Sequence, residues 1–525
     1  MATYASRPAL GVKVRGVATT RFAVPLGLAL LAALSLLLRV GEMGIGFWID
    51  EGLSVGIADR PLTDIPGVMR QDGSPPLYYV LLHGWMRIAG TSEPGARTLS
   101  LLFATLAIPV SFWAAQALFG RRAGWIAAVL AATNPFMTQY AQEARMYALV
   151  ALLGTIACAC LARALIASTS ERERRSWAIG SAVALAAMFY THNWCLFFAM
   201  AWGATWLVLL WRADAATRPT LLRAGLIAFG GAILLWLPWV PTFVYQVAHT
   251  GAPWSQSPSV SALLGVPGQL LGTVAQGVLA LTAGAGVGAL LTRGEQARAR
   301  VALILLAVGA ATVLIAWLVS QASPAWANRY LAVGLGPLLL AASGGLAYAG
   351  RLGLAGLLIV ALMGIGDGAP SQKSNVRDVA QAITPSLSRG DLVVSTQPEQ
   401  VPVLHHYLPD GLRFATLTGV TRDLGVTDWR DGTQRLDHVS ASRDLGPLLD
   451  RLPVGKRLVL ISPIFNDLRQ WRAPWTERIR IHSYEWDQYL SNDDRFMITA
   501  TEPPPPVTEP GPIPLEATVY VKTRR

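Results

Sequence analysis

Long apolar runs recur over the first two thirds of the chain, and they constrain the fold more than any other feature. An α-helix needs about 20 mostly apolar residues to cross the hydrocarbon core of a bilayer. Hydrophobic residues make up 53% of the sequence and charged residues only 14%, which excludes an ordinary soluble protein. About eleven membrane-spanning helices are predicted, at residues 22–40, 97–119, 123–140, 146–166, 177–191, 194–211, 222–240, 268–292, 301–320, 330–348 and 353–367.

The positive charge of the chain follows the same pattern. The formal net charge is +11, yet the 19 basic and 19 acidic residues from Lys373 onward cancel, so the whole excess lies in the apolar part. Arginines gather in the short segments between apolar runs, at 121–122, 172–175, 212–223 and 293–300. The positive-inside rule places such segments in the cytoplasm. We therefore interpret the charge as a topology signal and expect the lipid bilayer, and no nucleic acid, as a partner.

This topology predicts three parts of the chain. Residues 1–21 form a cytoplasmic N-terminus, and residues 22–367 form a transmembrane domain with a long first outer loop at 41–96. Residues 368–525 form a soluble domain outside the membrane. The preference for arginine over lysine indicates a GC-rich bacterial genome, so we expect a multi-pass protein of a bacterial cytoplasmic membrane.

The last part has the pattern of a small α/β domain. Apolar patches at 391–395 and 457–462 predict buried strands, and they are separated by helical stretches such as 375–388 and 443–451. No Walker loop, Rossmann glycine pattern or zinc spacing occurs in the sequence of this part. The fold class expected for the whole chain is an α-helical polytopic membrane protein with a small C-terminal α/β domain.

Asp50 and Glu51 are the first candidates for chemistry. In the motif FWIDEG they directly follow the first apolar run, so they place two carboxylates at the outer membrane surface. A general base must lie within hydrogen-bond reach of the proton it removes, and partial burial raises the pKa of a carboxyl group towards neutral. A solvated acidic pair beside a helix end is the structural alternative.

Two further candidates follow in the first outer loop. Asp72 precedes Pro75 and Pro76, which fix a turn and start an apolar helix predicted at 76–90. That helix is short for a membrane span and contains His83, so we expect it to lie on the outer surface. Asp72 and His83 either bind a ligand there or cap and pack the local structure.

Polar side chains also gather where later runs meet the outer surface. The segment QYAQEARMY carries Gln142, Glu143, Arg145 and Tyr147, and Glu143 and Tyr147 share one helical face. Ionisable groups at this depth of a membrane protein are more often functional than decorative. A structural ion pair between Glu143 and Arg145 is the alternative.

The last candidates are His192, in a turn between two apolar runs, and Arg329 and Tyr330, at the start of another run. His192 can bind a phosphate or sugar hydroxyls, and a structural histidine is the alternative. An arginine at this depth can neutralise a lipid phosphate through charge-assisted hydrogen bonds. The alternative for Arg329 is a side chain that extends along the apolar surface to keep its charge in water.

Six motifs occur in one order along the chain: FWIDEG, DGSPPLYY, GTSEPGARTLSLLFA, LFGRRAG, NPFMTQYAQEARMYAL and NRYLAVGLGP. Together they resemble the GT-C membrane glycosyltransferases of the family-39 type, which include protein O-mannosyltransferases and the lipid A aminoarabinose transferase. The resemblance is continuous from about residue 40 to 166 and patchy to about residue 345. It implies a GT-C fold and a polyprenyl-phosphate-sugar-dependent glycosyltransferase.

The resemblance also implies a mechanism and site roles. It implies an inverting transfer of mannose, another hexose or a pentose from a polyprenyl-phosphate donor to a glycan, lipid or protein acceptor. Asp50 would be the base and Glu51 its acidic neighbour, Glu143 would match the acidic position of the second loop, and Arg329 would contact the donor phosphate. A divalent cation stays open as a cofactor, although no ligand cluster in the sequence predicts one.

One departure from this family concerns the donor phosphate. The aminoarabinose branch has a lysine just before the surface helix, where this chain has the sequence Asp72-Gly73-Ser74. The contact must therefore come from another cation, and His83, Arg87 and Arg145 are the alternatives. A lipid or solute transporter is the alternative for the whole chain, but transporters keep ionisable groups near the bilayer midplane and show two related halves. The sequence indicates neither.

Overall fold

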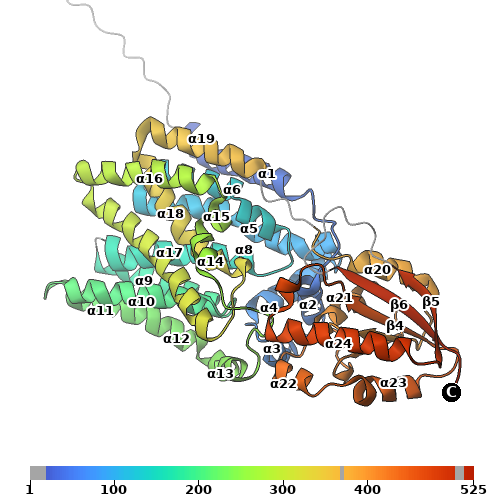
Figure 1. Cartoon of the computed structure of the whole chain (residues 1–525). Helices are drawn as coiled ribbons and strands as arrows, with labels where there is room; N and C mark the ends of the chain where they lie inside the picture. The colour runs from blue at the N-terminus through green and yellow to red at the C-terminus, as the bar shows by residue number, and fades with distance from the viewer. Residues whose placement is uncertain (1–18, 169, 367–371, 503–513) are drawn as a thin grey trace, which may run out of the picture.

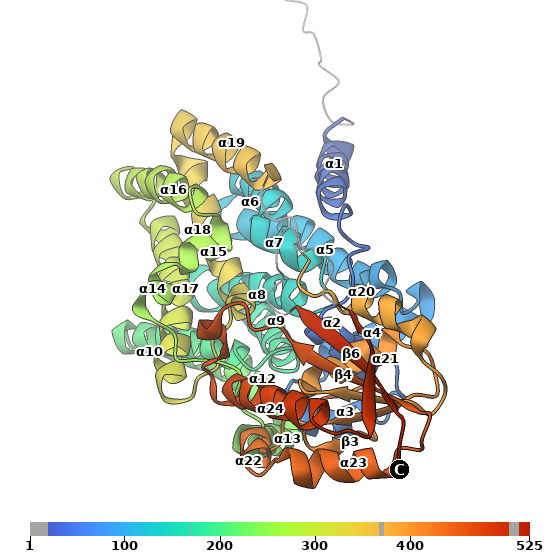
Figure 2. The ribbon, with the colours of Figure 1, turned by 45° about the vertical axis from the view of Figure 1, so that its right-hand side comes forward.

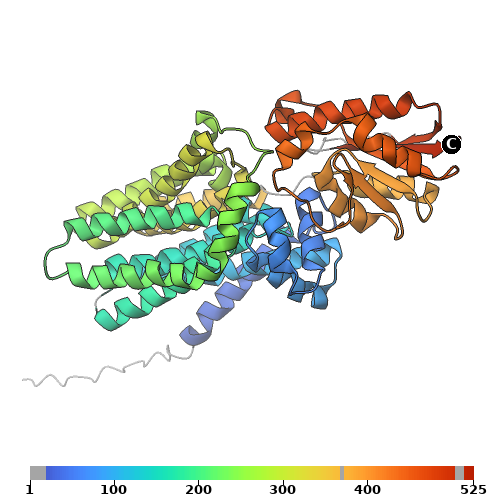
Figure 3. The same ribbon diagram turned by 90° about the horizontal axis from the view of Figure 1, so that it is seen from below.

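The computed structural model describes residues 19–168, 170–366, 372–502 and 514–525. A bundle of long helices and an α/β domain lie end to end, with the 41–96 segment packed where they meet (Figure 1; Figure 3). Most of the predicted N-terminal part, residues 1–18, and the predicted domain boundary at 367–368 lie outside the described residues.

Eight helical segments of the described residues are long and apolar enough to cross a bilayer, so the chain is a multi-pass membrane protein. They are α1 (Thr19–Arg39), α5 (Glu93–Phe119), α8 with its π-helical end (Tyr147–Ala167), α10 (Cys195–Arg212), the continuous run α11 to α13 (Arg218–His249), α16 (Ala275–Thr292), α17 (Gln296–Ala322), and α18 (Ala332–Tyr348) with the short turn Asn328–Leu331 before it. The other three predicted spans are also helical but shorter or more charged: α6 (Arg121–Thr133), α9 (Glu171–Phe189) and α19 (Gly350–Gly366).

Three predicted spans have different bounds in the structure. The span predicted at 123–140 is two helices, α6 and α7 (Pro135–Ala141), because the Asn134 side chain caps α7 by accepting a hydrogen bond from the Met137 amide. The span predicted at 268–292 is also broken, because Gly272 at φ 93° ends α15 (Val266–Leu271). The span predicted at 222–240 instead continues through α13 (Val240–His249), and the short α14 (Val260–Leu264) follows it.

The bundle is held together by close packing of small residues. Gly286 of α16 meets Gly345 of α18 so tightly that a Cβ atom on Gly286 would overlap the carbonyl oxygen of Gly345. Gly336 of α18 meets the backbone of α8 at Gly154 and Thr155 in the same way. Because lipid is as apolar as a leucine side chain, membrane helices associate through such close backbone contact. These contacts set where the helix ends lie.

The 41–96 segment forms three short helices at one end of the bundle: α2 (Ile49–Ala58), α3 (Ile65–Asp72) and α4 (Leu77–Ala89). Helix α4 lies where the sequence predicts the surface helix at 76–90. Its face of Tyr78, Tyr79 and Leu82 is buried, and Tyr78 shares a hydrogen bond with Ser100 of α5 at 3.0 Å. This packing anchors the segment to the bundle.

The C-terminal domain contains a six-stranded sheet of order β3-β2-β1-β4-β6-β5. Strand β1 pairs in parallel with β2 and β4, and the pairs β2–β3, β4–β6 and β5–β6 are antiparallel. The predicted strands at 391–395 and 457–462 are β1 and β4. The elements are α20 (Val376–Ile383), β1 (Leu392–Ser395), α21 (Val401–Tyr407), β2 (Arg413–Thr416), β3 (Gly419–Val420), α22 (Gly432–Asp437), α23 (Gly446–Arg451), β4 (Arg457–Pro463), α24 (Pro474–Ser491), β5 (Phe496–Glu502) and β6 (Leu515–Lys522).

Helices cover both faces of this sheet (Figure 2). Val393 faces the core that contains α20 and α21, whereas Leu392 and Val394 face a second core with α23 and α24. Both faces are buried, which explains why β1 is a continuous apolar run instead of an alternating one. The core on the α20 and α21 side is continuous with the core of the bundle.

Two glycines on α2 bring the C-terminal domain against the bundle. A Cβ atom on Gly52 would overlap Val403 of α21, and a Cβ atom on Gly56 would lie 2.6 Å from the carbonyl oxygen of Gly425. Only glycine permits so close an approach of two backbones. The domain therefore packs directly on the helix that carries Asp50.

Candidate active site

A cavity of about 440 Å³, which we call the central cavity, lies where the helix ends, the 41–96 segment and the C-terminal domain meet. Six of the eleven predicted site residues line it: Asp50, Asp72, Arg145, His192, Arg329 and Tyr330. They come from five separate stretches of the chain. The structure thus brings together residues that the predicted topology only places on one side of the membrane.

Asp50 lies in the first turn of α2, where the helix dipole favours a carboxylate. Its Oδ2 atom is 3.4 Å from Arg329 Nε and 3.8 Å from Arg145 Nε. Burial acts to raise the pKa of this carboxyl group, but the positive charges of Arg329, Arg145 and Lys373 outweigh it and hold the pKa below its ordinary value. Asp50 is therefore ionised in this state.

Several buried polar atoms around Asp50 lack a hydrogen bond. Asp50 Oδ2, Arg145 Nε, Arg329 Nε and Tyr147 Oη are all buried, and none has a hydrogen-bond partner among the described residues. A buried polar atom without a partner costs about 1–3 kcal/mol, so native proteins rarely leave several together. A cluster of them beside a cavity is the arrangement expected of a site that binds a polar ligand.

Arg329 and Arg145 are positioned in different ways. The Arg329 guanidinium lies over three aromatic rings, at 5.0 Å from the Trp254 centroid, 5.4 Å from Tyr330 and 5.6 Å from Trp48. Arg145 is tied to α2, because its Nη1 donates to the Asp50 carbonyl oxygen at 3.2 Å. The rings and the helix hold both cations at the cavity wall.

His192 lines the cavity as a neutral side chain. Its Nδ1 atom accepts a hydrogen bond from the Trp194 amide at 3.1 Å, which leaves the proton on Nε2. Burial, together with the charges of Arg145 and Arg329, lowers the pKa of His192 to about 3. His192 can therefore donate one neutral hydrogen bond to a ligand.

Asp72 is the second carboxylate of the cavity, and its environment differs from that of Asp50. It lies at the end of α3, accepts a hydrogen bond from the Ser74 amide at 3.2 Å and another from Tyr79 Oη at 3.4 Å. Burial raises the pKa of Asp72 above its ordinary value. One cavity thus contains two carboxyl groups whose pKa values shift in opposite directions, an arrangement typical of acid–base sites.

The other half of the central cavity is apolar. Leu196 and Phe197 of α10, Phe243 and Val247 of α13, and Val319 of α17 line it. Val247 is 68% exposed and Val319 is 43% exposed, so this half of the cavity reaches the outer surface of the helix bundle.

The structure does not bring Glu51 to the cavity, which corrects its predicted catalytic placement. Its two carboxylate oxygens accept hydrogen bonds from Arg97 at 2.7 and 2.6 Å, and the Ala144 amide donates to Oε1 at 2.8 Å. The side chains of Glu51 and Arg97 are almost fully buried. Consecutive helical residues point about 100° apart, so Glu51 faces the bundle while Asp50 faces the cavity.

Four other predicted residues also lie away from the cavity. His83 Nδ1 is in hydrogen-bonding contact with the Ala58 carbonyl oxygen at 2.8 Å, which ties α4 to α2. The position of His83 therefore does not support its predicted ligand role. Gln142 and Glu143 lie behind Trp48 beside Glu51. Tyr147 is buried under the cavity wall, with its ring 6.0 Å from His192 and 6.2 Å from Tyr330.

Lys373 is a site residue that sequence reasoning missed. Its Nζ atom lies 2.5 Å from Glu143 Oε1 and 4.2 Å from the centre of the Trp48 ring. It comes from the segment between α19 and α20, 230 residues after Glu143. The one available signal is its position just after the last apolar run, on the predicted outer side.

Lys373 only partly offsets the effect of burial on Glu143. Burial and the neighbouring charges of Glu51 and Asp50 raise the pKa of Glu143, and the charge of Lys373 acts in the opposite direction.

Arg145, His83 and Arg87 are the alternatives for the donor-phosphate contact that a lysine makes in the aminoarabinose branch, and the three differ in position. Arg145 lines the cavity, whereas His83 is in contact with Ala58 and Arg87 is exposed on α4. No group of three or more His, Cys, Asp or Glu side chains suited to a metal ion occurs within the described ranges.

Comparisons with known proteins identify a related sequence family over part of the chain. Residues 73–239 match the family model described as dolichyl-phosphate-mannose-protein mannosyltransferase. A comparison with curated proteins gives no match by sequence. Arg145 and His192 lie within the matched residues, and Asp72 immediately precedes them.

Solved structures match over nearly the whole chain. The apo structure of ArnT from Cupriavidus metallidurans has a TM-score of 0.62 and 14% identity, covering 95% of this chain and 98% of that one. The same protein bound to undecaprenyl phosphate has a TM-score of 0.58 and 14% identity, covering 96% and 98%. The oligosaccharyltransferase AglB from Archaeoglobus fulgidus, in complex with an inhibitory peptide and a dolichol-phosphate, has a TM-score of 0.56 and 11% identity, covering 89% and 72%.

At such low identity these similarities establish the fold, and the family model adds an independent sequence match to the same group of enzymes. The sequence-based prediction of a GT-C fold is confirmed. The chain therefore has the fold of the GT-C membrane glycosyltransferases, and residues 73–239 match one of their families by sequence.

Proposed function

We propose that this protein transfers a sugar from a polyprenyl-phosphate donor to an acceptor on the outer face of the cytoplasmic membrane. The observation that supports this most directly is the division of the central cavity into a cationic half and an apolar half. A polyprenyl-phosphate sugar has the same division, because its charged phosphate lies between a hydrophilic sugar and a long apolar tail. The apolar half opens beside Val247 and Val319, where the tail remains in lipid while the phosphate enters the cavity.

In the proposed reaction the lipid phosphate is the leaving group. The acceptor oxygen forms a bond to the anomeric carbon, and the bond from that carbon to the phosphate oxygen breaks with its electron pair going to the phosphate. Arg329 and Arg145 stabilise the negative charge that develops there. Asp50 takes the proton of the acceptor hydroxyl from the opposite side, so the anomeric configuration inverts.

The charges around Asp50 support its proposed role as the base. In the free protein both arginines lie beside Asp50 and keep its pKa low, which makes it a weak base. A bound donor phosphate competes for the same guanidinium groups. The pKa of Asp50 then rises, so the carboxylate becomes a stronger base when the donor is present.

Relatives of this fold support the choice of donor. One structure of ArnT is bound to undecaprenyl phosphate, and the AglB structure is in complex with a dolichol-phosphate. We carry this donor class over to the present chain, with mannose, another hexose or a pentose as the sugar. The acceptor is a glycan, a lipid or a protein of the cell envelope.

The proposed topology follows from charge. The arginine-rich α10–α11 and α16–α17 turns lie at the end of the bundle away from the sheet (Figure 1). The positive-inside rule assigns that end to the cytoplasm, so the central cavity and the domain formed by residues 368–525 lie outside. Residues 22–367 are then the transmembrane catalytic domain of a bacterial enzyme.

The test uses purified protein in lipid nanodiscs with radiolabelled polyprenyl-phosphate mannose and a membrane extract as the source of acceptors. We expect polyprenyl phosphate to be released and the label to appear in a new product. A transporter or flippase, reconstituted in sealed vesicles, would leave the donor intact and move it across the vesicle membrane. Donor that is neither consumed nor moved, even when arabinose and glucose donors replace mannose, contradicts the proposal.

A further inference from the structure

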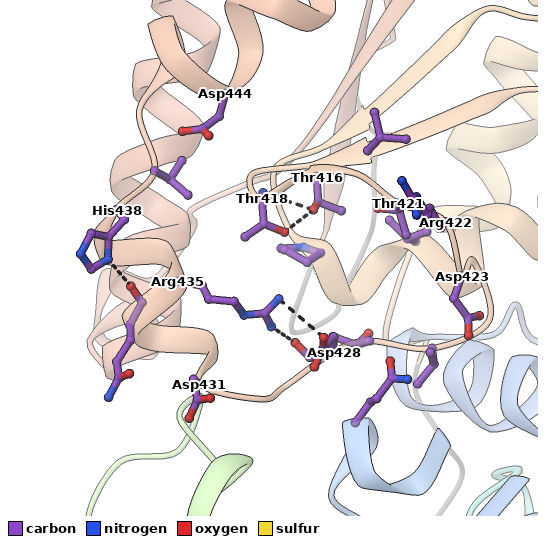
Figure 4. Close-up of a pocket in the computed structure, with 18 of the residues that line it drawn as sticks. Thr416, Thr418, Thr421, Arg422, Asp423, Asp428, Asp431, Arg435, His438 and Asp444 are labelled. Carbon is purple, nitrogen blue, oxygen red and sulfur yellow. Dashed lines mark hydrogen bonds and ion pairs between the residues drawn. The ribbon is translucent and has the colours of Figure 1, made fainter. Parts of the chain in front are cut away.

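Arginines line two further cavities, and the two cavities differ in what the arginines contact. The first, of about 770 Å³, lies in the C-terminal domain (Figure 4). There Arg435 pairs with Asp428 at 3.7 Å and Arg443 pairs with Asp444 at 3.2 Å, so two of its three arginines already have a carboxylate partner. The second is a groove of about 470 Å³ between α6 and α19, which we call the α6–α19 groove. Its volume lies in the range of about 300–1,000 Å³ typical of ligand pockets.

The α6–α19 groove is cationic at one end and apolar along the rest. Arg121 and Arg122, the first two residues of α6, form the cationic end. Its walls are apolar side chains of both helices: Trp125, Ile126, Val129, Leu354 and Leu357. Val129 lies about two turns beyond Arg121, or about 12 Å further along the helix. A phospholipid has the same order of groups, because its phosphate lies at the membrane surface and its acyl chains run from there into the bilayer.

The groove lies where α6 and α19 do not touch. At the other end of these helices, a Cβ atom on Gly364 of α19 would lie 2.0 Å from the carbonyl oxygen of Thr133, the last residue of α6. Near the start of α6, the Trp125 ring is instead held by α5 and α1, because it meets Phe112 edge to face at 5.0 Å and fills the space beside Gly27. Helices α1 and α19 lie on either side of α6 (Figure 2). The wall that Trp125 forms is therefore fixed by packing.

The arginines of this groove lack the acidic partners that other arginines of the bundle have. Those partners are Glu173 for Arg163, Glu171 for Arg223 and Glu295 for Arg298. No Asp or Glu occurs in residues 94–142, which contain α6, or in residues 296–366, which contain α19. Arg122 Nη2 donates to the Gly350 carbonyl oxygen at 3.0 Å, and Arg121 has no side-chain hydrogen bond or ion pair within the described ranges. Both guanidinium groups are therefore available to an anion.

The cationic end of the groove lies at the end of the bundle away from the sheet. Tyr348, the last residue of α18, donates a hydrogen bond to the Phe119 carbonyl oxygen at 3.2 Å, and Arg298 lies 5.8 Å from the centre of the Tyr348 ring. These contacts place the α5–α6 turn beside the start of α17 (Figure 1). The proposed topology assigns this end to the cytoplasm, where basic pockets between membrane helices bind anionic lipid head groups.

From these observations we propose that the α6–α19 groove binds an anionic phospholipid. Arg121 and the remaining N–H groups of Arg122 hold the phosphate by charge-assisted hydrogen bonds, because a guanidinium matches the geometry of phosphate oxygens. One acyl chain lies along Trp125 and Leu357, where it fills the space between the two helices. This site is separate from the central cavity, and its occupation does not depend on the proposed transferase function.

The test is native mass spectrometry of the full-length protein released from nanodiscs that contain equal amounts of dioleoylphosphatidylglycerol and dioleoylphosphatidylcholine. These lipids share their acyl chains and differ in the charge of the head group. We expect the wild type to retain phosphatidylglycerol selectively. Arg121→Ala/Arg122→Ala should lower this selectivity about tenfold or more, because charge-assisted hydrogen bonds are lost. Arg172→Ala/Arg175→Ala is the matched control, because it removes two exposed arginines that do not line the groove.

A second pair of variants tests the apolar wall and leaves both arginines in place. Leu357→Trp fills the groove, whereas Leu358→Trp adds the same side chain at the next position, which is 61% exposed and does not line the groove. We expect Leu357→Trp to lose the bound phosphatidylglycerol and Leu358→Trp to retain it as the wild type does. This pair also keeps the inference testable if the arginine variant does not fold.

Equal retention of the two phospholipids by the wild type overturns the inference. An equal loss in the two double arginine variants, or equal retention by Leu357→Trp and Leu358→Trp, overturns it as well. In nanodiscs that also contain undecaprenyl phosphate, retention of that lipid in place of phosphatidylglycerol has the same consequence. Wild-type protein that retains phosphatidylglycerol but never consumes donor contradicts the transferase function alone. Protein that consumes donor without selective retention contradicts this inference alone.

Discussion

Helix α2 carries two neighbouring carboxylates whose surroundings differ. On one side Glu51 is sealed in the protein, and its oxygens accept hydrogen bonds from Arg97 and from the Ala144 amide. On the other side Asp50 faces the central cavity, and its Oδ2 atom is buried without a hydrogen bond. Both residues lie beside arginines, but only Glu51 accepts hydrogen bonds through both of its carboxylate oxygens.

The difference separates structural charge from functional charge. A buried ion pair whose hydrogen bonds are all satisfied stabilises a particular packing and has nothing left to offer a ligand. The buried Asp50 Oδ2 atom and the Nε atoms of the two neighbouring arginines lack hydrogen bonds, so they remain available to a ligand. Asp50 and Glu51 should therefore respond in opposite ways to the loss of their charges.

The largest effect is expected at Asp50. Asp50→Asn should lower the rate of sugar transfer by about 10²- to 10⁴-fold, because an amide cannot take the acceptor proton. Thermal stability should fall less than in Glu51→Gln, because the ion pairs of Asp50 with Arg329 and Arg145, at 3.4 and 3.8 Å, are longer than the 2.6 Å pair of Glu51 with Arg97. Single-turnover rates and a thermal melt of the same preparation measure both; an active Asp50→Asn enzyme would remove Asp50 from its role.

Glu51 should show the reverse behaviour. Glu51→Gln leaves Arg97 buried without its counter-charge, which should destabilise the protein by about 3–5 kcal/mol. The loss should appear as a lower melting temperature and a lower yield of monodisperse protein. The double variant Glu51→Leu/Arg97→Met removes both charges and should recover part of the stability. A stable Glu51→Gln protein with no activity would instead make Glu51 the catalytic acid–base group.

A smaller effect is expected at Arg329. Arg329→Ala should raise the KM for the donor by about ten- to a hundredfold, because charge-assisted hydrogen bonds contribute about 1.5–3 kcal/mol each. The KM for the acceptor should change less. Arg329→Lys keeps the charge and serves as the control. If the alanine variant binds a polyprenyl-phosphate sugar as tightly as the wild type, Arg329 does not contact the phosphate.

The smallest effect is a change in pH dependence. Lys373 helps to hold the pKa of Asp50 below its ordinary value, so Lys373→Met should raise that pKa. The base must be ionised, and kcat/KM falls as the pH drops through its pKa. The acid limb of the pH profile should therefore move to higher pH in Lys373→Met. Lys456→Met is the control, because Lys456 is partly buried and does not line the central cavity. An unmoved acid limb in Lys373→Met would show that Lys373 does not act on Asp50.

Much of this protein is determined by its sequence. The apolar runs predict the membrane helices because a helix satisfies its backbone hydrogen bonds within a single continuous segment, and eight of the eleven predicted runs meet the length and hydropathy of a span. Local signals also predict the surface helix α4 and the strands β1 and β4. Helix breaks such as the one at Asn134-Pro135 also have a signal in the sequence, because capping is a local interaction. In a long apolar run this signal is weaker than the hydropathy.

Tertiary structure alone decides which polar residues meet. Asp50 and Glu51 are equivalent in sequence, and their roles separate only because α2 is rotated so that one faces the cavity and the other faces Arg97. The placement of Lys373 beside Trp48 depends on a contact between segments hundreds of residues apart, which no periodic pattern encodes. Hydropathy is a property of single residues, whereas a site is a property of distances that the packed chain sets.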